Sequence, residues 1–134
     1  MFMKMNNMIN NFSVVIPVFN EEEIFLESAD KIFKICQEMN MPFEIIFSEN
    51  GSLDNTKNLI HAFIEDKDNC YTINSNYANY GLALKNGFEI AKNDIVISFD
   101  IDYFSKKFLK QSLELDDNFV CLLYTSDAAD ELSS

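Results

Sequence analysis

The chain has 134 residues, a formal net charge of −12 and a composition that is 48% hydrophobic, with 13 phenylalanines. This length allows one modest domain and excludes two, and the apolar content excludes wholesale disorder. The negative charge argues against a nucleic-acid backbone as partner. It is consistent either with an acidic surface alone or with a protein that recruits cations to bind anionic ligands.

The first half of the chain predicts two strand–helix pairs. A β-branched apolar run at residues 13–18 predicts a buried strand, with Pro17 at its end, where a missing N–H does least harm. Asn20 is expected to cap a helix that runs to about Met39, with three glutamates in its first turn. A second strand is expected at residues 43–48, followed by a turn and by a helix that Asp54 caps.

The second half repeats this alternation. We expect a weaker strand at residues 70–74, a helix from about Tyr80 to Lys92 and a strand from Ile95 to Phe99. Strands that alternate with helices predict a parallel sheet with right-handed crossovers. The sequence is therefore that of an α/β protein.

The pair Asp100 and Asp102 directly follows the last of these strands. Side chains alternate along an extended strand, so two carboxylates two residues apart are expected to point the same way. Such a pair can hold one hard cation between them. In parallel sheets, ligands bind beyond the carboxyl ends of the strands, so the sequence predicts a metal there that holds a phosphorylated ligand.

Four segments together resemble the glycosyltransferases of family 2, which have the GT-A fold. They are VVIPVFNEE (residues 14–22), IIFSENGSLDNT (45–56), NYGLALKNG (79–87) and DIVISFDID (94–102). They occur in the order and spacing of that family and cover about residues 13 to 105. The resemblance implies a Rossmann-like GT-A half with a parallel sheet of about four strands in the order 3-2-1-4, flanked by helices. The ligand crevice would lie where the first and fourth strands adjoin.

The resemblance also implies an activity. Such enzymes transfer a sugar from a nucleotide-diphosphate sugar to an acceptor, here expected to be a glycan or a lipid-linked molecule, in a metal-dependent and inverting reaction. A divalent cation, Mn²⁺ or Mg²⁺, on Asp100 and Asp102 would neutralise the departing diphosphate. A membrane-associated, full-length parent at the cytoplasmic face is expected by analogy alone.

By resemblance, the nucleotide-sugar site comprises eight residues, and the first acid of the motif, here Asp100, often contacts the ribose rather than the metal in this family. The eight are Pro17, Phe19, Asn20, Glu21, Glu49, Asn50, Asp100 and Ile101. Structural alternatives remain open for Phe19 as a core residue and for Asn20 as a helix cap only. Glu49 and Asn50 stand where the family usually has two aspartates, which leaves the identity of the base open.

The two ends of the chain are expected to lie outside this domain. Residues 1–11 predict a flexible leader, and residues 12–120 a truncated nucleotide-sugar-binding domain. The run CLLYTSDAADE from Cys121 resembles the translation of a sequencing-library adapter, so residues 121–134 are expected to be a disordered tail. The catalytic base is expected beyond residue 120 of the parent, and no catalytic residue is assigned.

Two other functions remain open. A phosphohydrolase of the haloacid-dehalogenase kind also carries an Asp-x-Asp motif after an apolar strand, although usually in its first strand and followed by Thr or Val, where this chain has Phe104. The chain could also be an inactive nucleotide-binding fragment. Its three cysteines show no paired or metal-binding spacing, which predicts free thiols in a reducing cytoplasm.

Overall fold

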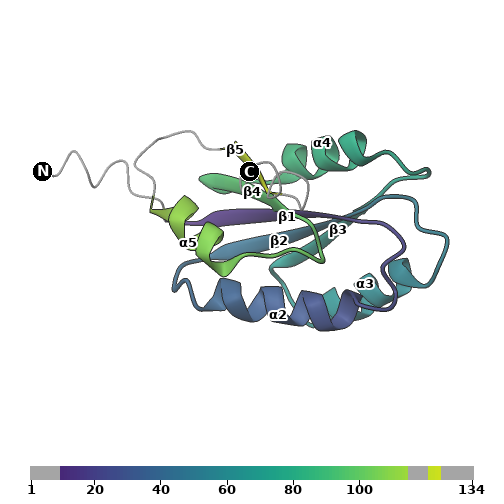
Figure 1. Ribbon diagram of the computed structural model, residues 1–134, viewed down its shortest axis with the longest axis horizontal. Helices are drawn as coiled ribbons and strands as arrows, with labels where there is room; N and C mark the ends of the chain where they lie inside the picture. Colours follow the sequence, from purple (N-terminus) through teal and green to yellow (C-terminus); the bar gives the residue numbers. More distant parts are fainter. Residues whose placement is uncertain (1–9, 115–120, 125–134) are drawn as a thin grey trace, which may run out of the picture.

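A computed structural model describes residues 10–114 and 121–124 of the chain, as an α/β fold with one parallel sheet and helices on both faces (Figure 1). The strands are β1 (Phe12–Val18), β2 (Phe43–Glu49), β3 (Cys70–Asn74), β4 (Ile95–Phe99) and β5 (Cys121–Tyr124). The helices are α2 (Phe25–Gln37), α3 (Thr56–Ile64), α4 (Tyr80–Ile90) and α5 (Lys106–Leu113).

The strand order is β3-β2-β1-β4-β5, and all neighbours are parallel. This confirms the predicted order 3-2-1-4 and adds a fifth strand that the sequence did not predict. Strand β5 falls on the first four residues of the segment that was expected to be a tail. The rest of that segment, and the expected leader up to residue 9, lie outside the described residues.

Strand β1 is the centre of the sheet and is buried along its whole length. It pairs with β2 from Phe12 to Val18 but with β4 only from Phe12 to Val15. Pro17 therefore lies where β4 no longer pairs with β1, as its missing N–H predicts. Beyond this point no strand pairing joins β1 to β4, because β4 itself ends at Phe99.

The two faces of the sheet are covered differently. Helices α2 and α3 lie together on one face and α4 on the other (Figure 1). Aromatic side chains fill the first face, where Phe25 and Phe63 contact Phe47 edge to face with ring centroids 5.1 and 5.8 Å apart. On the second face, Gly87 of α4 lies directly against Val15. The absence of a side chain at Gly87 lets the helix approach β1 closely.

The predicted start of the first helix was wrong. Helix α2 begins at Phe25, and Asn20 does not cap it but has a left-handed backbone conformation with φ 51°. Glu21 instead begins a turn, because its carbonyl oxygen accepts hydrogen bonds from the N–H groups of Ile24 and Phe25 at 3.2 and 2.9 Å. Asparagine is one of the few side chains that tolerates the left-handed region, so Asn20 reverses the chain between β1 and this turn.

Two further expectations concern thiols and membranes. Cys36 and Cys70 are free and buried, and burial raises the pKa of the Cys70 thiol to about 12. The thiols are therefore protonated and unreactive. Within residues 10–114 and 121–124, no helix has the length and apolar character needed to cross a membrane.

Candidate functional site

The loops that follow β1, β2 and β4 converge with the start of α4 on a cavity of about 280 Å³. Its lining residues are Pro17, Val18, Phe19, Glu21, Asn50, Tyr80, Asp100, Ile101 and Asp102. The cavity therefore lies at the carboxyl ends of the strands, where β1 and β4 no longer pair, as predicted for a ligand crevice in a parallel sheet.

The Asp-Ile-Asp segment forms a tight turn. Strand β4 ends at Phe99, and the N–H of Tyr103 donates to the carbonyl oxygen of Asp100 at 3.1 Å. The predicted end of the strand at Phe99 is thus confirmed, but a turn, and not the alternation of an extended strand, places the two carboxylates. The buried side chain of Ile101, which is 3% exposed, anchors the turn in the core. Both aspartates nevertheless line the same cavity, because a turn of this kind brings its residues close together.

Tyr80, at the start of α4, reaches this turn from the other side of the cavity. Its hydroxyl donates a hydrogen bond to Oδ1 of Asp100 at 3.2 Å. The preceding residue, Asn79, caps α4 by accepting the N–H of Leu82 at 3.0 Å. The cap fixes where the helix begins and hence where Tyr80 stands.

Asn20 links two loops and does not line the cavity. Its side-chain oxygen accepts the N–H of Leu53 at 2.8 Å, and its own N–H donates to the Ser52 hydroxyl at 2.8 Å. These two bonds join the loop after β1 to the loop after β2. Asn20 therefore supports the wall of the cavity. This role differs from both predictions for Asn20, which were a helix cap and a residue that binds the nucleotide sugar.

Glu49 also lies outside the cavity lining. Its carboxylate is fully buried and accepts hydrogen bonds from the N–H groups of Gly51 and Ser52 at 3.1 and 2.6 Å. Gly51 has a positive φ of 76°, and a side chain there would collide with the backbone of Tyr77. Glu49 therefore holds together a turn that only glycine can make at this position.

Asn50 lines the cavity and is 6% exposed. Its side-chain oxygen accepts the backbone N–H of Asn79 at 2.6 Å, and its own N–H donates to the carbonyl oxygen of Val18 at 2.8 Å. A backbone N–H can only donate, so the atom that faces Asn79 must be the amide oxygen. The amide NH₂ of Asn50 is then the part of the side chain that remains for a ligand.

The carboxylates of this region repel one another. Partial burial, followed by the charges of Asp102, Asp54 and Asp100, raises the pKa of Glu21 above its usual range. The donor set is made only of oxygen atoms, which suits a hard cation such as Mg²⁺ or Mn²⁺, and a cation would relieve the repulsion. The described residues contain no group of three or more His, Cys, Asp or Glu side chains that could hold a metal by themselves. Mg²⁺ commonly binds through one or two carboxylates, with substrate phosphates and water as further ligands, so the pair fits such an ion.

Seven of the nine residues that were expected to bind nucleotide or metal line this one cavity. The exceptions are Asn20 and Glu49, which support its walls. Phe19 is 40% exposed, so its alternative interpretation as a core residue was wrong. Tyr80 was missed as a site residue, although it lies in a segment that carried the resemblance.

The chain is similar in sequence to known proteins over most of its length. Residues 13–123 match the sequence model of a family described as "Glycosyl transferase family 2". A protein of Proteus mirabilis (strain HI4320), named undecaprenyl-phosphate 4-deoxy-4-formamido-L-arabinose transferase, is 35% identical over 97 residues, which are 70% of this chain and 29% of the relative. Proteins of the same name from Serratia proteamaculans (strain 568) and Yersinia pestis (strain Pestoides F) are 34% and 33% identical over 97 and 103 residues. The matched residues are 70% and 75% of this chain and 29% and 31% of these two relatives, respectively. The chain thus spans about a third of the length of these curated relatives.

Proposed function

Because the chain belongs to glycosyl transferase family 2, we propose that it carries the donor-binding site of an enzyme that transfers a sugar from a nucleotide-diphosphate sugar to an acceptor. The observation that carries the proposal is one cavity that joins Asp100 and Asp102 to Phe19 and Asn50. The family match excludes the alternative of a haloacid-dehalogenase-like phosphohydrolase.

In this proposal, Asp100 and Asp102 hold a divalent cation together with the diphosphate of the donor. When bound, the cation supplies Lewis-acid stabilisation of the charge that develops on the leaving diphosphate. Tyr80 orients Asp100 through its hydrogen bond. The crowding of acids around Glu21 supports a cation here, because the uncompensated charges would repel the donor's phosphates.

The nucleotide's base is proposed to lie against Phe19 and Asn50. The exposed ring of Phe19 offers a flat apolar surface for stacking. Pro17 adds a rigid wall beside it. Since the oxygen of Asn50 is engaged by Asn79, Asn50 offers the base a donor and favours an acceptor atom on its edge.

The proposed acceptor is a polyprenyl phosphate or a related lipid-linked molecule. The support for this is that relatives with 33–35% identity are named as transferases to undecaprenyl phosphate. A glycan acceptor is the second candidate, and an inverting mechanism remains part of the proposal. Such a lipid acceptor would bring the parent enzyme to a membrane, and a cytosolic nucleotide sugar would place its active site at the cytoplasmic face.

A thermal-shift assay of the full chain tests the proposal. UDP-sugar and GDP-sugar are compared with and without Mn²⁺, and an acyl phosphate mimic serves as the phosphohydrolase control. We expect stabilisation by a nucleotide sugar that requires Mn²⁺ and is lost in Asp102→Ala. The matched control is Asp94→Ala. Asp94 is an exposed aspartate directly before the first residue of β4, at the end of the strand opposite the cavity. Absence of any nucleotide-dependent shift in the wild-type chain would leave only an inactive fragment.

A further inference from the structure

Asp102 also lines a second, larger cavity that the proposed donor site does not use. This cavity of about 400 Å³ lies between α2 and the loop at residues 101–105. Only Ile101 and Asp102 line both cavities. A ligand in the second cavity would therefore lie next to whatever is bound in the first.

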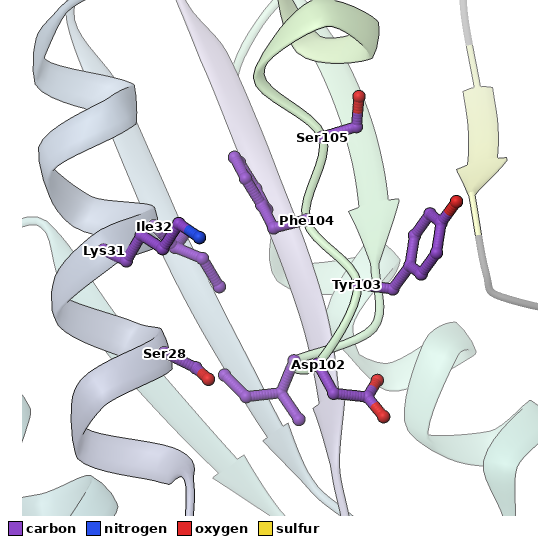
Figure 2. A pocket seen from close by; sticks show the side chains of 8 residues that line it. Ser28, Lys31, Ile32, Asp102, Tyr103, Phe104 and Ser105 are labelled. Atoms are coloured by element: carbon purple, nitrogen blue, oxygen red, sulfur yellow. The ribbon is translucent and has the colours of Figure 1, made fainter.

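Helix α2 contributes polar groups to the second cavity. Figure 2 shows the Lys31 ammonium and the Ser28 hydroxyl pointing from α2 toward the loop that carries Asp102. Positions three apart lie on the same face of a helix, so both side chains reach the cavity from one wall. Tyr103 points away from α2 in the same view.

The ammonium of Lys31 has no ion-pair partner among the described residues. In contrast, Lys34, one turn further along the helix, pairs with Asp30 at 2.9 Å. Asp102 is the acid that lines the cavity with Lys31, yet the two do not form a salt bridge within 4.0 Å. The cavity thus has a cationic wall and an anionic wall with space between them.

The remaining lining of this cavity is partly apolar, whereas Lys31 and Asp102 are themselves exposed. Ile32 and Ile101 are buried, and Phe104 is partly buried, so three apolar side chains border the space. The Ser28 hydroxyl can donate a hydrogen bond to an anion that lies beside the Lys31 ammonium.

We propose that this second cavity binds the phosphate group of the acceptor, with Lys31 as its ion partner and Ser28 as a hydrogen-bond donor. The assignment to an acceptor rests on the proposed function. It explains why the cavity adjoins the donor site at Asp102, because acceptor and donor must meet for a sugar to pass between them.

NMR titration of the ¹⁵N-labelled full chain tests this proposal, with inorganic phosphate and geranyl phosphate as separate probes. Both probes are expected to shift the amide signals of Ser28, Lys31 and the 101–105 loop. Lys31→Gln should weaken binding about tenfold, which is the effect of losing one charge-assisted hydrogen bond. Lys34→Gln is the matched control and should leave the affinity unchanged, since Lys34 does not line the cavity.

Equal affinity in the wild type and Lys31→Gln, or equal weakening by both substitutions, would overturn the site. Binding of inorganic phosphate with exclusion of geranyl phosphate would overturn the acceptor assignment. A parallel titration with UDP and Mn²⁺, in the wild type and in Asp102→Asn, reports on the proposed function separately. If the affinity for phosphate is the same in the wild type and Lys31→Gln, while UDP binding is weakened in Asp102→Asn, only the inference of a phosphate site fails. If Lys31-dependent phosphate binding persists without any UDP binding, the anion site stands and the donor proposal fails.

Discussion

The hydroxyl of Tyr80 donates a 3.2 Å hydrogen bond to Oδ1 of Asp100. The two residues lie 20 positions apart, one at the start of α4 and the other directly after β4. The bond joins the first carboxylate of the Asp-Ile-Asp turn to a helix whose start is fixed by the Asn79 cap. The orientation of Asp100 therefore depends on a helix on the opposite side of the cavity.

Replacing Tyr80 by Phe tests this relationship. We expect Tyr80→Phe to weaken Mn²⁺-dependent nucleotide binding about tenfold or more, because the loss of one hydrogen bond to a charged group costs about 1.5–3 kcal/mol. Isothermal titration calorimetry with UDP and Mn²⁺ measures the change. Tyr77→Phe is the control, since Tyr77 is 60% exposed and does not line the cavity. A wild-type affinity in Tyr80→Phe would show that the hydroxyl does not position Asp100.

Replacing Asn50 by Asp tests the proposed contact with the base. The carboxylate can still accept the N–H of Asn79, which the Asn50 oxygen now accepts at 2.6 Å, but the NH₂ donor becomes an acceptor. Uracil presents N3–H as a donor, whereas cytosine presents N3 as an acceptor. We expect Asn50→Asp to shift the ratio of UDP to CDP affinity toward UDP by about tenfold.

The ratio of the two affinities is the quantity to measure, because the added negative charge weakens both nucleotides alike. Asn55→Asp is a control at an exposed position outside the cavity lining. An unchanged ratio in Asn50→Asp would place the base away from this side chain.

The raised pKa of Glu21 predicts a pH-dependent gain in stability on its replacement. Burial and the charges of Asp102, Asp54 and Asp100 raise this pKa, so the folded state favours protonated Glu21. The stability that protonated Glu21 contributes is fully present below the pKa of this group in the unfolded chain, about 4.3. It is lost as the pH rises through the pKa of Glu21 in the folded chain. Glu21→Gln should therefore stabilise the chain at pH 7, by about 0.5 kcal/mol for a partly buried group that solvent still screens.

Urea unfolding at pH 7 and at pH 4 measures this difference, which should disappear at the lower pH. Saturating Mn²⁺ with UDP should also reduce it, because a cation offsets the same repulsion. Glu23→Gln, an exposed position outside the cavity lining, is expected to have no such effect. A loss of stability in Glu21→Gln at pH 7 would contradict the assigned cause.

Gly87 and Gly81 of α4 form a matched pair for testing how closely the helix approaches the sheet. A Cβ at Gly87 would collide with the Cγ1 atom of Val15, whereas one at Gly81 would lie 3.6 Å from the side-chain oxygen of Asn79. We expect Gly87→Ala to destabilise the chain by about 1–3 kcal/mol through overpacking. Gly81→Ala should be neutral or stabilising by up to about 1 kcal/mol through helix propensity.

Chemical unfolding measures both variants. Adding Val15→Ala to Gly87→Ala removes the colliding methyl groups, so the double variant should lose less stability than the sum of the two single losses. Strict additivity of the two losses would show that the helix does not rest on Val15.

The sequence predicted the strands and their parallel sheet because burial leaves a periodic record along the chain, whereas the order of the strands followed from the family resemblance. The apolar runs of β1, β2 and β4 and the alternation of strands and helices require no knowledge of distant contacts. The same order places the loops after these strands at one edge of the sheet. The seven cavity-lining residues that were predicted follow from this arrangement together with the family resemblance.

The partners of individual polar side chains could not be predicted in this way. Asn20 and Glu21 resemble a helix start locally, yet Asn20 binds Leu53, 33 residues away, and α2 begins later. Glu49 resembles a ligand-binding acid, but it is buried and holds a turn. Asn20 depends on a partner in a distant loop, whereas Glu49 accepts from residues two and three positions further on and is kept from the cavity by its burial in the folded chain.

The sequence by itself thus determined the parallel sheet and the edge at which the cavity lies, because hydrophobic periodicity and chain order are local properties. Only the tertiary structure decided which side chains face the cavity. In the folded chain, the side-chain oxygen of Asn50 accepts the N–H of Asn79, and the Tyr80 hydroxyl donates to Asp100. Lys31 has no ion-pair partner among the described residues. These outcomes depend on distances between segments far apart in the chain, which packing fixes and local pattern does not encode.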